Sequence, residues 1–216
     1  GLLSLVNSKT RPAYHTCRMK FRSRIPRPPK EKYYHLWIAA AKDKVFFENN
    51  LDKAYLISLF QRYLSPRASL NSTPTYSKDL QLIAYSLTEY GMNLLLVGAN
   101  SHIVEDFGQS LLLDYANYIQ EQRVWEILPF DTIFAYDDLA DEHEALATSR
   151  EVHLLHDNWR SDRYSSIGFY LDDRRGDWLH AEHLANLYNN DSIWYQNYLM
   201  DDTQPAKMPA LEFIET

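Results

Sequence analysis

The chain has little of the chemistry that cysteine provides. Cys17 is the only cysteine among 216 residues, so the sequence has neither an internal disulfide nor a cysteine-based metal motif. This cysteine usage is typical of a reducing intracellular compartment, and we expect a cytoplasmic protein. The sequence also lacks an apolar run as long as a membrane span and an opening signal-peptide pattern, so we expect no membrane role.

Positive charge is scarce outside one segment. The formal net charge is −7, from 22 basic and 29 acidic residues. Residues 1–35 hold nine of the basic residues and one acid, Glu31, which leaves 13 basic and 28 acidic residues and a formal −15 on the remainder. A basic arm on an acidic body either reaches a phosphate backbone or lies along an acidic protein surface.

Proline divides the chain into an arm and a folded domain. Four prolines interrupt any periodic pattern in residues 1–31, which we interpret as a basic extended arm. The apolar patterns of a globular domain occupy 32–188, and a polar, proline-containing tail is predicted at 189–216.

The apolar pattern of the domain switches between the periods of strands and helices. Short apolar and aromatic runs between polar turns predict four strands, at 33–39, 80–87, 93–99 and 130–136. Apolar residues recurring at intervals of three and four predict three helices, at 51–64, 104–122 and 137–155. This order matches the split βαβ ferredoxin-like plan, an α+β fold with an antiparallel sheet and helices on one face.

The segment AYSLTEYGMNLLL, residues 84–96, resembles AYVLMPNHVHLLL of the REP-associated tyrosine transposases, an insertion-sequence-200-like family with the HUH single-strand transposase fold. Similar pieces follow in the same order. Residues 104–120 resemble that family's LSRLMQSLGRRYVRYIN, and residues 130–138 resemble YKSILVEDD. The resemblance implies the insertion-sequence-200-like transposase architecture over about residues 33–180.

The residues that carry the family's chemistry are missing at the matching positions. In that family two histidines around one hydrophobic residue hold Mg²⁺ or Mn²⁺, and a tyrosine on a later helix cleaves the strand. Here the histidine positions are Gly91 and Asn93, and Glu151 stands at the tyrosine position in REVHLLH, residues 150–156. One amide cannot replace two imidazoles. We therefore expect no catalytic residues at the family positions, no metal cofactor and no strand cleavage.

Other residues offer chemistry, each with a structural alternative. Tyr115 and Tyr118 are candidates for a substitute nucleophile, or else core residues of an amphipathic helix. His180 and His183 are weak candidates for a metal pair, or else part of a polar helix face, because the spacing places no third ligand. A lower-ranked group of the same kind is formed by His153, His156 and Asp157.

Two clusters of basic residues are candidates for phosphate contacts. The arm and the start of the domain supply the candidates that we rank first, Arg18, Lys20, Arg22, Arg24, Arg27, Lys30 and Lys32. A second cluster lies among aromatic and acidic residues, which suits stacking on nucleic acid but favours surface ion pairs; it comprises Arg160, Arg163, Arg174 and Arg175.

Together these features predict a transposase-like DNA-binding protein without catalytic activity. What the resemblance implies is recognition of hairpin or single-stranded DNA, often as a homodimer. One alternative is an acidic scaffold or protein-interaction domain that kept the fold without binding nucleic acid, which the −15 body favours. A lower alternative is an active metal-dependent tyrosine transposase with a rearranged site, which requires histidine and acidic side chains to converge near a tyrosine.

Overall fold

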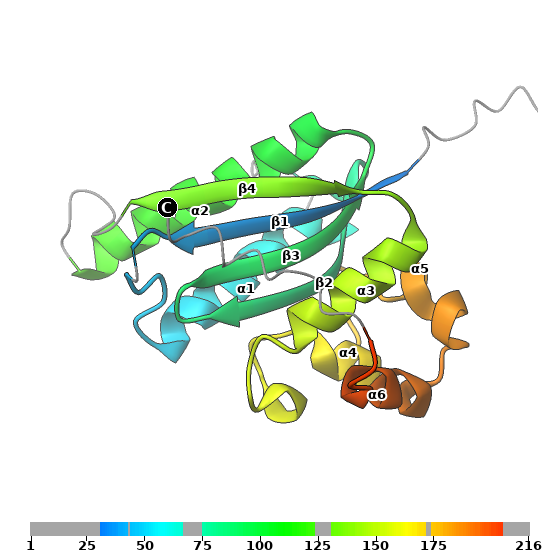
Figure 1. Cartoon of the computed structure of the whole chain (residues 1–216). Helices are drawn as coiled ribbons and strands as arrows, with labels where there is room; N and C mark the ends of the chain where they lie inside the picture. The colour runs from blue at the N-terminus through cyan, green and yellow to red at the C-terminus, as the bar shows by residue number, and fades with distance from the viewer. Residues whose placement is uncertain (1–30, 43, 67–74, 124–130, 172–173, 205–216) are drawn as a thin grey trace, which may run out of the picture.

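Four antiparallel strands form the sheet at the centre of this α+β protein (Figure 1). The computed structural model describes residues 31–42, 44–66, 75–123, 131–171 and 174–204. The strand order is β2-β3-β1-β4, and every neighbouring pair is antiparallel. The strands are β1 (Lys32–Ala40), β2 (Leu80–Thr88), β3 (Gly91–Gly98) and β4 (Thr132–Leu139). All four strands predicted from the sequence are confirmed.

Two long helices cover one face of the sheet. Helices α1 (Asn50–Leu64) and α2 (Ser101–Arg123) lie behind the sheet in Figure 1. Strand side chains alternate between the two faces, and Met92, Leu94 and Leu96 of β3 point into the core that these helices close. The apolar residues of both helices recur at helical spacing, so they lie on one side of each helix. This apolar side packs against the sheet.

A second layer of helices covers part of the other face. Leu95 and Val97 of β3 pack with apolar residues of this layer in a second core cluster. The layer contains α3 (Glu142–His153), α4 (Ile167–Leu171), α5 (Glu182–Ala185), α6 (Ser192–Met200) and the 3₁₀ turns Trp159–Ser161 and Asn186–Tyr188. The expectation of helices on one face only is wrong, because β3 is apolar on both of its sides.

Two predicted boundaries differ from the structure. The acidic run expected to open a helix at residue 137 instead completes β4, which continues to Leu139. Helix α3 begins after Asp141, whose side chain accepts a hydrogen bond from the Glu144 amide, while the Glu144 carboxylate accepts one from Ala140. The packed part of the chain also extends past residue 188, because Tyr195 and Leu199 of α6 lie in the second core cluster.

The two helices behind the sheet are joined by a buried ion pair. Asp52 in the first turn of α1 is 1% exposed, and its carboxylate accepts a hydrogen bond from the Arg123 guanidinium at the end of α2. The same guanidinium lies 3.4 Å from the Glu48 carboxylate.

In the parts of the chain that the structure describes, no helix is both long and apolar enough to span a membrane.

Replacing Arg123 by Met should destabilise the fold strongly. The Asp52 carboxylate would stay buried without its cation, which costs about 3–5 kcal/mol. Urea unfolding of the variant measures the loss. The exposed Arg62, also on α1, provides the control, because Arg62→Met should change the free energy of unfolding by less than about 0.5 kcal/mol. Equal effects of the two substitutions would contradict this account of the pair.

Candidate functional site

The face of the sheet opposite α1 and α2 carries the positions that match the family's metal ligands. Asn93 lies opposite Trp37 in the pairing of β3 with β1, and its side chain is on this face. The ring nitrogen Nε2 of His35 donates a hydrogen bond to Asn93 Oδ1 at 2.9 Å, and the His35 ring lies 5.2 Å from the Trp37 ring. Asn93 is only 3% exposed. Its amide therefore acts as a buried partner of an imidazole from the next strand.

Gly91 lies where β3 and β1 approach each other too closely for any side chain. A Cβ atom at residue 91 would be 2.3 Å from the Ile38 carbonyl oxygen and 2.7 Å from Ala39 Cα. Both neighbours are backbone atoms of β1, which is paired on its other side with β4. A histidine at this position would require β1 to shift. The residues present therefore do not fit the Mg²⁺ or Mn²⁺ that the resemblance implies, for reasons of both donor chemistry and space.

The position that matches the nucleophile lies on a helix of the same layer. Helix α3 carries Glu151 and packs on the Asn93 face of the sheet. The Glu151 carboxylate is partly exposed and lies 3.8 Å from Arg150 Nη1. Arg150 also donates hydrogen bonds to the carbonyl groups of Tyr198, at 3.0 Å, and Asp201, at 3.0 Å. Gly91, Asn93 and the helix of Glu151 thus share one face, although none of the three residues has the family's chemistry.

The two candidates for a substitute nucleophile lie on the opposite face, between α1 and α2. The Tyr115 hydroxyl donates a hydrogen bond to the Phe46 carbonyl at 2.6 Å, and its ring stacks on Phe46 at 4.9 Å. Burial raises the pKa of Tyr115 above its ordinary value. Tyr118 stacks on Tyr55 at 3.9 Å. The structural interpretation of both tyrosines therefore agrees with their positions, and neither shares a cleft with Asn93.

His180 and His183 are near each other but bind separate protein partners. His180 Nδ1 lies 2.6 Å from Glu182 Oε1, and His183 Nε2 lies 2.5 Å from Gln81 Oε1. The two ring centroids are 6.4 Å apart. Across the described ranges, no group of three or more His, Cys, Asp or Glu side chains could hold a metal ion. The His183 side chain therefore links α5 to β2, whereas the His180 side chain bonds within its own segment.

The basic residues predicted to contact phosphate lie mostly outside the described residues. Lys32, the first residue of β1, is exposed. The arm candidates before it, which lie outside the described residues, are Arg18, Lys20, Arg22, Arg24, Arg27 and Lys30.

In the second basic cluster, the Arg160 guanidinium lies 5.1 Å from the centroid of the Trp159 ring, and that of Arg174 lies 4.9 Å from the centroid of Phe169. Asp162, one of the acids expected to pair with these arginines, instead lies 3.7 Å from His156. Arg160 also donates a hydrogen bond to the Met200 sulfur at 2.6 Å, so both arginines contact apolar or aromatic side chains.

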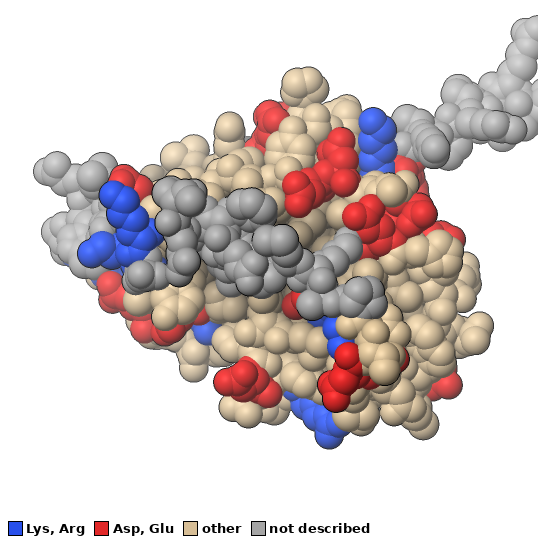
Figure 2. Space-filling model, in the orientation of Figure 1, with Lys and Arg blue, Asp and Glu red and all other residues tan. Residues whose placement is uncertain are grey.

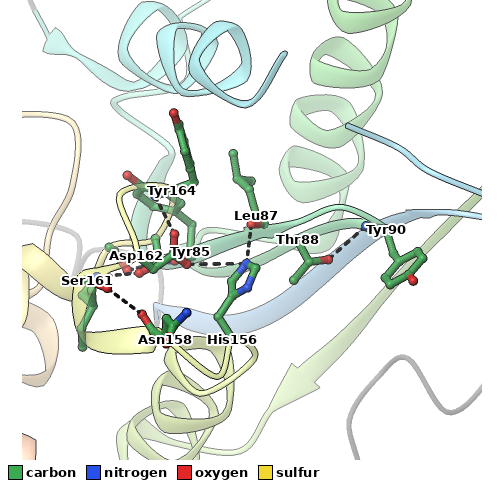
Figure 3. A network of polar contacts seen from close by, with 12 residues as sticks. Tyr85, Leu87, Thr88, Tyr90, His156, Asn158, Ser161, Asp162 and Tyr164 are labelled. Atoms are coloured by element: carbon green, nitrogen blue, oxygen red, sulfur yellow. Dashed lines mark hydrogen bonds and ion pairs between the residues drawn. The ribbon is translucent and has the colours of Figure 1, made fainter. Parts of the chain in front are cut away.

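A polar hollow lies beside the end of β2. Figure 3 shows the network of polar contacts that surrounds it, close to the β2–β3 turn. His156 Nε2 donates a hydrogen bond to the Leu87 carbonyl at 3.0 Å, and the Asp162 carboxylate accepts one from the Tyr164 amide at 2.8 Å. The hollow has a volume of about 390 Å³ and is lined by His156, Asp157, Asn158, Ser161, Asp162, Arg163 and Tyr164. The sequence signal for it is the polar run at 157–163, which follows helix α3.

His153 and His156 are close in the sequence but have different surroundings in the structure. His153 is buried, and its two ring nitrogens lie 2.7 Å from the Tyr195 hydroxyl and 2.7 Å from the Ser166 hydroxyl. Burial lowers the pKa of His153 to about 3. The neutral ring connects α3 to α6 and to the residue before α4, and it does not line the hollow beside His156.

Comparisons of the chain with family models, with curated proteins and with solved structures find no match in any of the three sets. The function proposed below therefore depends on the residues and their geometry.

Restoring both histidines at the family positions should fail to create a metal site. Gly91→His combined with Asn93→His should be less stable than Asn93→His alone by about 1–3 kcal/mol, because a side chain at residue 91 overlaps the backbone of β1. Urea unfolding measures the stability and calorimetry with Mn²⁺ measures binding. The prediction would be contradicted by a double variant that is as stable as Asn93→His and binds Mn²⁺. Such a result would show that the backbone of β1 shifts at little cost in stability.

Acid should weaken the fold through His153. The folded-state pKa of about 3 lies below the ordinary value of 6.5, so between these pH values the unfolded chain binds the additional proton. The free energy of unfolding therefore falls as pH falls, by at most about 1.4 kcal/mol per pH unit from this residue. Unfolding of the wild type and of His153→Gln at pH 6.5, 5.5 and 4.5 isolates the effect. His153→Gln should show the shallower slope; parallel slopes would contradict the assignment.

Proposed function

We propose that this protein is a transposase-derived DNA-binding protein that has lost strand cleavage. The observation that carries the proposal is the order of the sheet, β2-β3-β1-β4, built by the element sequence β1-α1-β2-β3-α2-β4. Such an order is that of the split βαβ ferredoxin-like plan, and it supports the insertion-sequence-200-like architecture that the resemblance implies.

The placement of three positions supports the same proposal. The two positions that match the family's metal ligands lie on β3, and the helix that matches its nucleophile helix, α3, packs on the face of Asn93. A chance resemblance in residues 84–96 would not require α3 to lie there. With Gly91, Asn93 and Glu151 in these places the site lacks the family's metal ligands and its nucleophile, so we infer that its function is binding.

The basic arm is the part of the chain best suited to phosphate. Residues 1–30 contain eight Lys or Arg and no acid, and they lead into β1 at the exposed Lys32. Arginine and lysine that neutralise phosphates release bound counterions, which makes affinity depend steeply on salt. As the resemblance implies, the ligand is hairpin or single-stranded DNA, bound by a monomer or a homodimer.

Binding of a labelled DNA hairpin should depend on the arm and on salt, but not on metal. Fluorescence anisotropy at 50 and 200 mM salt should show an affinity that falls by about tenfold or more for contacts to several phosphates. Changing Arg18, Lys20, Arg22 and Arg24 to Gln should flatten this dependence, whereas EDTA should leave it unchanged. The matched control changes four exposed acids of the body to their amides. Absence of salt-sensitive binding at low ionic strength would refute the proposal.

A protein-interaction scaffold is the second candidate, because acidic residues gather where β4 passes into α3. Asp137, Asp138, Asp141 and Glu142 follow one another there, and carboxylates cluster in this part of the surface (Figure 2). Asp138, Asp141 and Glu142 line a second hollow, beside the start of β1, and Lys32 is the Lys or Arg side chain that borders it. The scaffold would be favoured if the protein binds a basic peptide but no DNA. Asp137→Asn combined with Asp138→Asn should then weaken the binding of that peptide.

A further inference from the structure

The outer side of helix α6 carries exposed apolar side chains, and the helix contains no charged residue. Ile193 is 70% exposed, Trp194 39% and Met200 44%, and residues 192–200 include no Lys, Arg, Asp or Glu. Figure 1 shows α6 at the lower margin of the molecule, and its inner side packs in the second core cluster. Single exposed apolar residues are ordinary, but three on one nine-residue helix without a charge indicate a contact surface.

Three residues form a stripe along this outer side. Ile193, Asn197 and Met200 are exposed and follow one another at intervals of four and three, so they lie on one side of the helix. This spacing is that of helices that pack along each other. Asn197 lies in the middle with one apolar residue on each side of it, so the stripe has nearly the same pattern in both directions. Such a surface complements a second copy of itself related by a two-fold axis.

The tryptophan beside the stripe is held in place by the protein itself. The Trp194 ring stacks on Tyr198, with centroids 5.3 Å apart, and on Tyr188, with centroids 6.3 Å apart. These contacts fix the orientation of a ring that is still partly exposed, so little side-chain entropy is left to lose when a partner binds. Tryptophan is among the residues that contribute most to the free energy of protein association.

The charges at the two ends of α6 are opposite and complement a reversed copy. At the start of the helix, Asp191 caps the first amides through Oδ1, so Oδ2 can accept a further hydrogen bond. At the other end, the exposed Arg160 donates a hydrogen bond to the Met200 sulfur. The Asp201 carboxylate at this end is bonded within its own turn. In an antiparallel pair of helices, Asp191 of each copy would therefore meet Arg160 of the other.

We propose that α6 packs antiparallel against α6 of a second copy of this chain, across a two-fold axis near Asn197. Ile193 of one copy then lies beside Met200 of the other, and the two Asn197 amides, each a donor and an acceptor, bond to each other. One short helix offers less area than the about 800 Å² that each partner of a standard interface buries, so the dissociation constant should be about 10–500 µM. Helix α6 follows residues 33–180, over which the chain resembles the transposases, and the pairing does not depend on DNA.

Self-association of the full chain without DNA tests the surface. Sedimentation equilibrium from about 5 to about 500 µM should show a dimer that grows with concentration. Ile193→Lys should raise the dissociation constant at least about tenfold, because it places two like charges in the interface. Leu113→Lys is the matched control, since Leu113 is 63% exposed on α2, and it should leave association unchanged. The proposal is overturned by equal effects of the two substitutions, or by a wild type that stays monomeric, which would assign the stripe to a different partner.

Cysteine cross-linking tests the orientation of the two helices. In a Cys17→Ser background, Asn197→Cys should form a disulfide between two copies at least about tenfold faster than Leu113→Cys under mild oxidation. Ile193→Cys and Met200→Cys should each cross-link slowly alone but rapidly when the two proteins are mixed, because antiparallel packing brings these positions together. Non-reducing gels measure the rates, and circular dichroism verifies that each variant is folded. Rapid cross-linking of Ile193→Cys with itself would indicate a parallel pair and overturn the proposed arrangement.

Discussion

Burial of β3 along its whole length is the constraint on which the rest of the structure depends. All eight residues of this strand are buried, and a strand buried on both sides needs a layer on each face of its sheet. Helices α1 and α2 supply one layer, and the helices from α3 to α6 supply the other. The second layer is assembled from short elements, and it is held by specific polar contacts such as those of His153.

The same close packing determines the surroundings of Gly91 and Asn93. At Gly91 the backbone of β1 occupies the space that a side chain would need. Two residues later, Asn93 is joined to His35 rather than to an ion. Both residues are therefore part of the contact between β1 and β3.

Charge is distributed unevenly between the interior of the protein and its surface. The ionisable groups inside are paired or neutral: Asp52 has Arg123, and His153 is uncharged at neutral pH. The exposed acids gather where β4 leads into α3, and the basic residues gather in the arm before β1. Tyr34 of β1 pairs with Asp138 of β4, so these acids lie beside the start of β1, where the arm joins the domain.

The sequence by itself determined the four strands, the helices α1 and α2, the basic arm and the absence of paired histidines at Gly91 and Asn93, because each depends on local pattern or identity. It misplaced the start of α3, since Asp137 and Asp138 are acids that β4 tolerates at an exposed edge. Only the tertiary structure decided that helices cover both faces and that His153 is buried while His156 lines a hollow. It alone brought together His35 and Asn93, 58 residues apart, and pressed Ile38 against Gly91. These contacts follow from how distant strands pair, which no local pattern records.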